Sequence, residues 1–532
     1  MKLVYGIKDK PRFPQLLAFA LQQLLAIMAA TIAVPMIISG HYDNFDLSMS
    51  TAAALIGAGF GTIVYLLFTK FRSPVFLGSS FAFIGGYAAV QKLFVDNPEM
   101  NWIPYAGVGV VCAGLMYVVL AALVKAFGAR KVMRFFPPIV TGPVIICIGL
   151  TLANSAINNC EANWWIAVLA IVIVVSCNIW GKGMIKIVPI LLGVVGSYLV
   201  AVLLATFCGE TVEFASVNVV QSATLSGNLG SMINDAIEPA AEALKAFAAQ
   251  NGEYVTNISM TETVTSKVIC AFGNPSMKLF TEEAIQKIKD AAWIGLPFAM
   301  KDTVFSLFGN CDLGTLGSAI LIMMPIALAT MVEHIGDICA ISSTVGENFM
   351  EKPGFHRTLL GDGLATSLAS LFGAPANTTY GENTGVLALS KVYDPRVIRI
   401  AALFAILFSF CPKFAALVSA MPTATIGGVS LILYGMISAV GVRNIVENQV
   451  DFTNTRNVII AALILVLAIG ISYSGSIQIG IVSLSGLAVA SIVGIALNAI
   501  LPGKDYSFEQ DHQGSTSVDL SGAVNMDEKN KK

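Results

Sequence analysis

The sequence between Pro375 and Pro395 reads PANTTYGENTGVLALSKVYDP, a polar, glycine-broken stretch inside a chain made largely of membrane-length apolar segments. Irregular backbone at membrane depth persists only where protein or a water-filled cavity satisfies its N–H and C=O groups. The carboxylate of Glu382 would cost roughly 2.5–3.5 kcal/mol at the centre of a bilayer. We therefore predict that this stretch forms a binding site within a helical membrane fold.

The composition of the chain indicates an all-α polytopic membrane protein. Of 532 residues, 56% are hydrophobic and only 12% are charged, and the mean hydropathy is +0.76; soluble domains carry about 25% charged residues. The net charge of -2 gives no basic surplus for nucleic acid. The sequence has no P-loop, no CxxC pair and no zinc-type Cys/His spacing, so no ATP-driven pump, cofactor or metal is expected.

The apolar segments number about fourteen, each near the ~20 residues that a tilted helix needs to cross a bilayer. Basic residues gather before the first segment and in every second loop after it, at Lys2, Lys8, Lys10, Arg12, Lys70, Arg72, Lys125, Arg130, Lys131, Arg134, Lys182 and Lys186. Basic loops stay on the cytoplasmic side. We expect a plasma-membrane protein with both termini in the cytoplasm and a disordered, charged tail at 501–532.

A polar insertion separates the two halves of the chain at 209–315, and the odd number of segments before it places it outside the cell. Helical patterns occur at 237–250 and 281–293. The insertion contains Cys270 and Cys311, which form either an external disulfide or two free thiols. Nothing in the sequence assigns this insertion a fold or a role.

The two halves of the chain share a sequence pattern. FPPIVTGPV at 136–144 and MPTATIGGV at 421–429 share Pro, Gly and Val at the same offsets. Upstream of each lies a short, broken apolar segment, at 77–83 and 380–383. Paired broken segments in corresponding positions point to a transporter site at the interface of an inverted repeat, near the bilayer midplane.

Few ionisable residues lie within the apolar segments. Glu333 and Asp337 are four apart and share a helix face. Two acids this close in a low dielectric do not readily ionise together, which suits one of them to carry a proton. The alternative is a solvated helix end over 331–337. We expect His334 to be structural and Asp362 to pack or cap a helix.

Several separate blocks resemble the nucleobase–ascorbate transporter family, in its bacterial uracil permease branch. The blocks are QQLLAIMAATIAVP at 22–35, LGSSFAF at 77–83, EHIGD at 333–337, PGFHR at 353–357 and TYGENTGV at 379–386. The resemblance covers about 11–208 and 316–500 and implies fourteen spans in a 7+7 inverted repeat. It implies a core domain from 11–130 and 316–415, a gate domain from 135–208 and 420–500, and broken spans three and ten at the midplane.

The resemblance also implies site residues. Glu333 and Glu382 match the acids that contact the nucleobase, Ser80 and Phe81 match the opposite wall, Tyr380 and Gly381 lie beside the base, and Ala30 is a contact from the first span. The chain departs from the family at Gln23, where His is common, and at Asp337, where the uracil branch has His. The proton route therefore involves Glu333, with Asp337 as a second candidate. The segment Leu77–Phe83 could equally form ordinary helix contacts.

The resulting hypothesis is a proton-coupled uracil importer, with uracil, protons and lipid as its partners and a homodimer as a further expectation. The alternatives are a xanthine or urate permease of the same family, an anion exchanger or channel of similar inverted-repeat fold, and a non-transporting receptor. A fixed carboxylate such as Glu382 at a half-helix N-terminus would repel an anion, which argues against the exchanger. Measured uptake would exclude the receptor.

Overall fold

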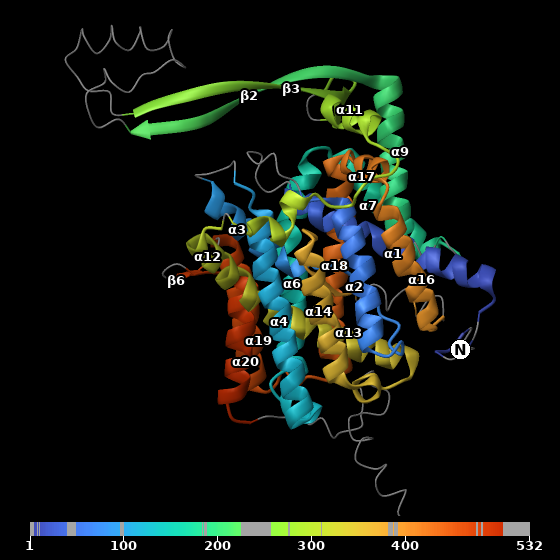
Figure 1. The fold of residues 1–532 in the computed structure, drawn as a ribbon, viewed down its shortest axis with the longest axis vertical. Helices are drawn as coiled ribbons and strands as arrows, with labels where there is room; N and C mark the ends of the chain where they lie inside the picture. Colours follow the sequence, from blue (N-terminus) through green and yellow to red (C-terminus); the bar gives the residue numbers. More distant parts are fainter. Residues whose placement is uncertain are drawn as a thin grey trace, which may run out of the picture.

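The computed structural model describes residues 5–503 except 8, 10, 40–48, 96–99, 183–184, 186–188, 225–256, 275–276, 310, 381–386, 388–391, 475–476 and 480–481. Its helices form one bundle, and a long β-hairpin projects from one end (Figure 1). The predicted polytopic helical class is confirmed. Eight helices of the described residues are long and apolar enough to cross a membrane, or nine if α16 (Pro395–Ser409) and α17 (Pro412–Ser419), bent by 86°, count as one span.

The helices pack mainly into two groups. In group one, α14 (Phe355–Leu371) packs on α4 (Ile103–Phe127) and α2 (Thr51–Phe68), while α16 packs on α2 and α1 (Phe13–Ser39). Helix α12 (Leu313–Met323) also packs on α4. Helix α13 (Ala327–Val345) touches α4 of this group and α6 and α20 of the other, so it lies at the boundary between them.

Group two is centred on α6 and α18. It comprises α6 (Pro138–Glu161), α7 (Trp164–Trp180), α9 (Pro189–Cys208), α18 (Thr423–Glu447), α19 (Thr455–Ser474) and α20 (Gly486–Ile500). Glycines let α6 and α18 approach closely, because a Cβ on Gly149 would lie 2.1 Å from the carbonyl oxygen of Tyr434. Small residues at such contacts are typical of helix packing in membranes.

Short elements join these helices. They are β1 (Leu77–Ser79), η1 (Phe81–Phe83), α3 (Ile84–Gln91), η2 (Lys92–Phe94), α5 (Ala129–Met133), η4 (Met300–Asp302), η5 (Val304–Leu307), η6 (Met324–Ile326), η7 (Met350–Gly354), β5 (Asn377–Thr379), β6 (Ile477–Ile479) and β7 (Val482–Leu484). Strands β6 and β7 pair antiparallel before α20. Strand β1 lies in the predicted broken segment 77–83, and β5 ends just before the predicted segment 380–383, of which only Tyr380 is among the described residues.

The insertion contains a β-sheet, which the expectation of an all-α chain missed. Strand β2 (Gly209–Thr224) pairs antiparallel with β3 (Asn257–Ala271), and β4 (Lys278–Thr281) adds a third strand. The signal was present in β3, where Ile258, Met260 and Val264 alternate with threonines, a pattern of period two that favours a strand. The long apolar helices on either side made this strand pattern hard to recognise.

The sheet leads directly into helix α11 (Glu282–Asp290). The Thr281 hydroxyl accepts a hydrogen bond from the Ala284 N–H at its start, and acids in its first turn and lysines in its last turn complement the helix dipole. The predicted helix at 281–293 is thus confirmed over 282–290, whereas the one at 237–250 lies outside the described residues. Cys270 and Cys311 are both free thiols.

Candidate functional site

The two broken segments cross inside group one as a short antiparallel ladder. Leu77 pairs with Thr379, Gly78 with Thr378 and Ser79 with Asn377. Main-chain hydrogen bonds extend the ladder at both ends. The Ser80 N–H donates to the carbonyl oxygen of Ala376 at 2.7 Å, and the Tyr380 N–H donates to the carbonyl oxygen of Phe76 at 3.3 Å. Pairing satisfies polar backbone groups that would otherwise be unmet at membrane depth.

Side chains from neighbouring helices fix this crossing in place. The Thr62 hydroxyl of α2 accepts a hydrogen bond from the Leu77 N–H at 3.0 Å, and the Tyr87 hydroxyl of α3 accepts one from the Ala376 N–H at 2.8 Å. From the second segment, the Asn377 amide donates to the carbonyl oxygen of Gly57 at 2.8 Å. The crossing is therefore bound to α2 and α3 and does not depend on the two strands alone.

Tyr380 packs directly onto the first segment. Its hydroxyl donates a hydrogen bond to the carbonyl oxygen of Ser79 at 3.0 Å, and its ring is almost fully buried. A Cβ on Gly78 would lie 2.4 Å from Cζ of that ring. Gly78 is thus required for the close approach of the two segments. Gly381 and Glu382, predicted to continue the site, lie outside the described residues.

The first segment presents Phe81 towards group two. The Phe81 ring lies edge-on to Tyr434 of α18, with ring centroids 5.6 Å apart. Helix α3 begins just beyond, at Ile84, so the N–H groups of a helix start lie close to this point. The hydroxyl oxygens of Ser79 and Ser80 are buried without a hydrogen-bond partner in the described part of the chain. Buried hydroxyls of this kind are rare unless a ligand or water meets them.

Helix α13 carries both predicted acids and brings Asp337 to the crossing. Asp337 is buried and accepts a hydrogen bond from the Thr379 hydroxyl at 2.8 Å, which links α13 to β5. Glu333 lies one turn earlier on the same helix and is half-buried. Ala30 is buried on α1, a helix that contacts β1. The described residues of the predicted site thus come from α1, the crossing and α13.

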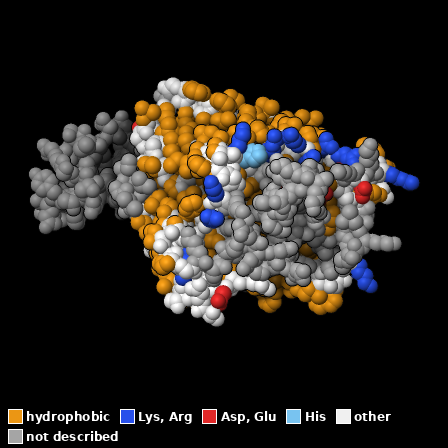
Figure 2. Space-filling view, turned by 90° about the horizontal axis from the view of Figure 1, so that it is seen from below, with side chains coloured by type: hydrophobic (Ala, Val, Ile, Leu, Met, Phe, Trp, Pro, Cys, Tyr) orange, Lys and Arg blue, Asp and Glu red, His pale blue; other side chains and the backbone are white. Residues whose placement is uncertain are grey.

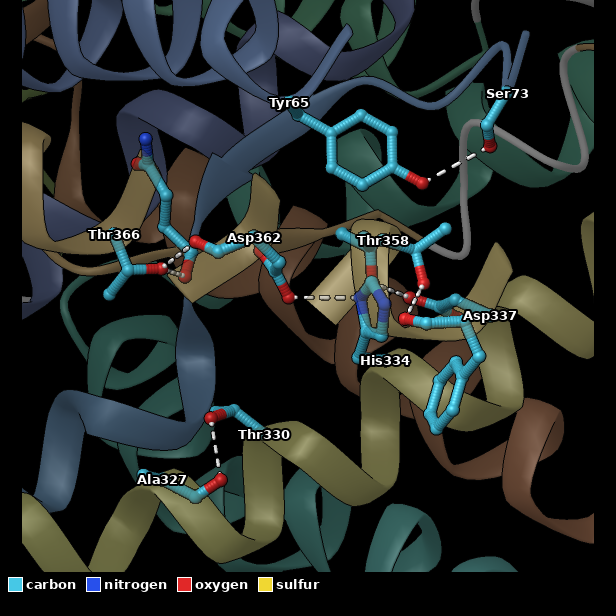
Figure 3. A network of polar contacts seen from close by, with 12 residues as sticks. Tyr65, Ser73, Ala327, Thr330, His334, Asp337, Thr358, Asp362 and Thr366 are labelled. Carbon is cyan, nitrogen blue, oxygen red and sulfur yellow. Dashed lines mark hydrogen bonds and ion pairs between the residues drawn. The ribbon is translucent and has the colours of Figure 1, made fainter. Parts of the chain in front are cut away.

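Next to this site, a buried His–Asp pair joins α13 to α14, and the sequence did not predict the pairing. His334 Nδ1 on α13 is 3.0 Å from Oδ2 of Asp362 on α14, and both side chains are fully inaccessible (Figure 3). The rings of Tyr65, Tyr117 and Phe355 surround the imidazole. The expected structural histidine and packing acid are therefore partners. Their helices were recognisable in the sequence, but the rotation that turns the two side chains towards each other was not.

A cavity of about 960 Å³ lies between the two helix groups and extends to Phe81. Group one contributes the C-terminal part of α1, the start of α2 and much of α3, and group two contributes the second half of α6 and parts of α18, α19 and α20. Amides and hydroxyls line the α6 side, among them Asn154, Ser155 and Asn158. Helices α11 and α17 stand at the end with the hairpin (Figure 1), so the cavity opens there. We call it the outer vestibule.

No cluster of His, Cys, Asp and Glu suited to a metal ion occurs within the described ranges. Apolar helices, paired broken segments and a polar vestibule that ends at them define a membrane transporter, which moves a solute rather than transforms it. The sequence profile Xan_ur_permease, described as Permease family, matches residues 14–477. The chain belongs to this permease family.

Individual relatives agree with this membership. The uracil permease of Bacillus subtilis (strain 168) is 34% identical over 514 residues, covering 94% of this chain and 96% of its own length. The uracil permease of Bacillus caldolyticus is 32% identical over 520 residues, covering 96% and 97%. Among solved structures, the transmembrane domain of the cyanobacterial bicarbonate transporter BicA superposes with a TM-score of 0.53 at 14% identity, covering 93% of this chain and 100% of that domain. This last likeness concerns the fold alone.

Proposed function

We propose that this permease imports uracil together with protons by alternating access. The observation that carries the proposal is the β1–β5 crossing at the base of the outer vestibule, where Phe81 meets the cavity and Asp337 is bonded to the crossing strand. The names of the relatives at 34% and 32% identity supply the substrate. One proton entering across 100 mV yields about 2.3 kcal/mol, enough for roughly fifty-fold accumulation.

The proposed site matches the chemistry of a neutral pyrimidine. Ring N–H groups need acceptors, which Glu333 and Glu382 provide, and ring carbonyls need donors, which Gly381 and the start of α3 provide. Phe81 offers an apolar face to the ring, while Ser80, Tyr380 and Ala30 shape the pocket around it. The proton is assigned to Glu333, with Asp337 as the neighbouring acid.

The proposed architecture has fourteen spans in a 7+7 inverted repeat. Group one then corresponds to the core domain at 11–130 and 316–415, and group two to the gate domain at 135–208 and 420–500. The division of the packing between the two groups supports this assignment. Relative movement of the groups would close the outer vestibule and expose the site to the opposite side.

The proposal is tested by competition for radiolabelled uracil uptake in a uracil-uptake-deficient cell. Uptake should be blocked by excess unlabelled uracil, 5-fluorouracil and thymine, and poorly by xanthine, urate or hypoxanthine. An analogue that leaves one buried polar group unpaired loses about 1–3 kcal/mol, which is about 5- to 160-fold in affinity. If xanthine competed as well as uracil, the chain would be a purine permease. Absence of uptake would support a receptor.

An anion exchanger is the second candidate, because the BicA domain shares this fold. The proposed site argues against it, since Asp337 places a carboxylate beside the crossing, and this group together with the proposed Glu382 would repel an anion. Bicarbonate in excess should therefore leave uracil uptake unchanged. Inhibition by bicarbonate at matched pH and ionic strength would favour the exchanger instead.

We further propose a plasma-membrane location with both termini in the cytoplasm and the insertion outside. The end of the bundle opposite the hairpin carries many Lys and Arg side chains and few Asp or Glu (Figure 2), as the positive-inside rule requires of a cytoplasmic face.

Cysteine labelling tests this orientation. In intact cells, Gln286→Cys in α11 should react with a membrane-impermeant thiol reagent, whereas Ser515→Cys in the C-terminal tail should react only after the cells are opened. The unsubstituted chain, which has nine cysteines of its own, gives the background. Labelling of Ser515→Cys but not Gln286→Cys in intact cells would reverse the topology.

A further inference from the structure

The insertion is attached to group two by its sheet. Leu279 and Phe280 of β4 are buried in an apolar cluster with Ile166 and Ala201 of α7 and α9. The Phe280 ring also packs on Tyr198 of α9, with centroids 5.8 Å apart. Burial of two large apolar side chains favours this attachment. The sheet is therefore docked on group two and is not a free appendage.

The segment after α11 is attached to group one instead. The Gly295 N–H donates to the carbonyl oxygen of Phe410 at 3.0 Å, and the Lys413 N–H donates to the carbonyl oxygen of Ala292 at 2.9 Å. This segment therefore lies along the α16–α17 turn. The Ser50 hydroxyl at the start of α2 donates to the Pro297 carbonyl at 3.3 Å. Further along, the Asn101 amide donates to the carbonyl oxygen of Lys301 at 2.9 Å.

Helix α11 spans the interval between these two attachments. Thr281, Glu283, Ala284 and Lys287 line the outer vestibule, whereas Gln286 does not. No residue of the helix is buried. Ile285 packs against the apolar cluster of β4, α7 and α9, and the Lys413 side chain of α17 donates to the carbonyl oxygen of Lys289 at 3.3 Å. These contacts and the attachments on either side hold the helix in place. The insertion thus forms a strap across the mouth of the vestibule, from group two to group one.

The strap also contributes charged side chains to the mouth of the vestibule. Glu283 and Lys287 form an ion pair at 2.6 Å on α11, and Lys92 lies on the α3 wall of the same cavity. Both members of the pair are largely exposed, so the pair adds little to stability. Below it, the described walls offer amides and hydroxyls, which suit an uncharged polar solute rather than an ion.

We infer that α11 is part of the external access path of the transporter, with its Thr281–Ala284–Lys287 face forming one wall through which an uncharged, hydrogen-bonding heterocycle passes to Phe81. The inference rests on the proposed function. Because the strap joins both helix groups, α11 has to move with them whenever the vestibule opens or closes. Bulk added to its inner face should therefore obstruct transport, and bulk added to its outer face should not.

The test compares Ala284→Cys with Gln286→Cys, two positions on one helix of which only the first faces the vestibule. Intact cells are treated with a bulky, impermeant methanethiosulfonate reagent, and the initial rate of uracil uptake is measured before and after. Modified Ala284→Cys should lose about tenfold in rate, while modified Gln286→Cys stays within about twofold of its untreated value. A thiol reductant should restore the loss, which shows that the fold is intact.

The outcomes separate this inference from the proposed function. If the untreated chain and both untreated variants take up no uracil, the proposed function fails. If they transport uracil, and complete modification of Ala284→Cys leaves the rate unchanged, the inference is overturned. Equal, reductant-sensitive losses at both positions, above the background of the unsubstituted chain, would also overturn it, because the inner face would then have no special role.

Discussion

Glu333→Gln should abolish proton-driven accumulation of uracil. The substitution keeps the size of the side chain and its place on α13, but an amide cannot take up and release a proton in each cycle. In proteoliposomes with an imposed proton gradient, the internal-to-external ratio of uracil should fall from roughly fifty-fold at 100 mV to about unity. Exchange of labelled for unlabelled uracil should persist, because exchange needs no net proton transfer.

Glu447→Gln is the matched control, since it makes the same change at the C-terminal end of α18, where Glu447 pairs with Arg443. It should accumulate uracil as the parent does. Uphill transport retained in Glu333→Gln would reassign the proton, and Asp337, bonded to Thr379, is the next acid to test. A pH profile alone does not choose between them, because two neighbouring acids titrate as a coupled pair.

Gly78→Ala should lower uracil transport by about tenfold or more, by a steric route. The new Cβ would lie 2.4–2.7 Å from Cζ, Cε2 and Oη of Tyr380, a buried ring whose hydroxyl is bonded to the adjacent Ser79 carbonyl. The ring cannot yield without breaking that bond and shifting the crossing. Strain of this kind typically costs about 1–3 kcal/mol, which lowers binding by about tenfold or more.

Gly470→Ala is the control, because a Cβ at Gly470 on α19 meets no atom within 4 Å and Gly470 does not line the vestibule. Uptake, surface expression and thermal stability in detergent are measured for both variants. Gly470→Ala should match the parent in all of them, while Gly78→Ala should be expressed and folded yet transport uracil at most about a tenth as fast as the parent. Uptake by Gly78→Ala within about twofold of the parent would show that Tyr380 does not need its place beside β1.

Those parts of the candidate site that depend on breaks in the apolar segments could be predicted from the sequence. Glycines and polar residues at 77–83 and 380–383 break apolar segments, so the meeting of two broken segments was foreseeable. The spacing of Glu333 and Asp337 likewise placed both acids on one helix. These are local properties, because they follow from residues within one turn or one short segment.

The contacts that depend on tertiary packing could not be predicted. His334 and Asp362 belong to different helices, and only the rotation and depth of α13 against α14 bring them to 3.0 Å. The vestibule wall formed by α11 required knowledge of where 209–315 folds back, and its sheet comes from a strand pattern of modest strength. Sequence periodicity indicates which face is apolar, but not which partner covers it.

The crossing of β1 and β5 has a consequence for how new specificities arise in such a scaffold. The ladder itself consists of main-chain hydrogen bonds, while Thr62, Tyr87 and Asn377 anchor it and Gly78 gives it clearance. Side chains at the rim, outside this set, can be exchanged while the backbone ladder persists. Libraries that vary the rim and spare the ladder are therefore the efficient way to redirect the cargo.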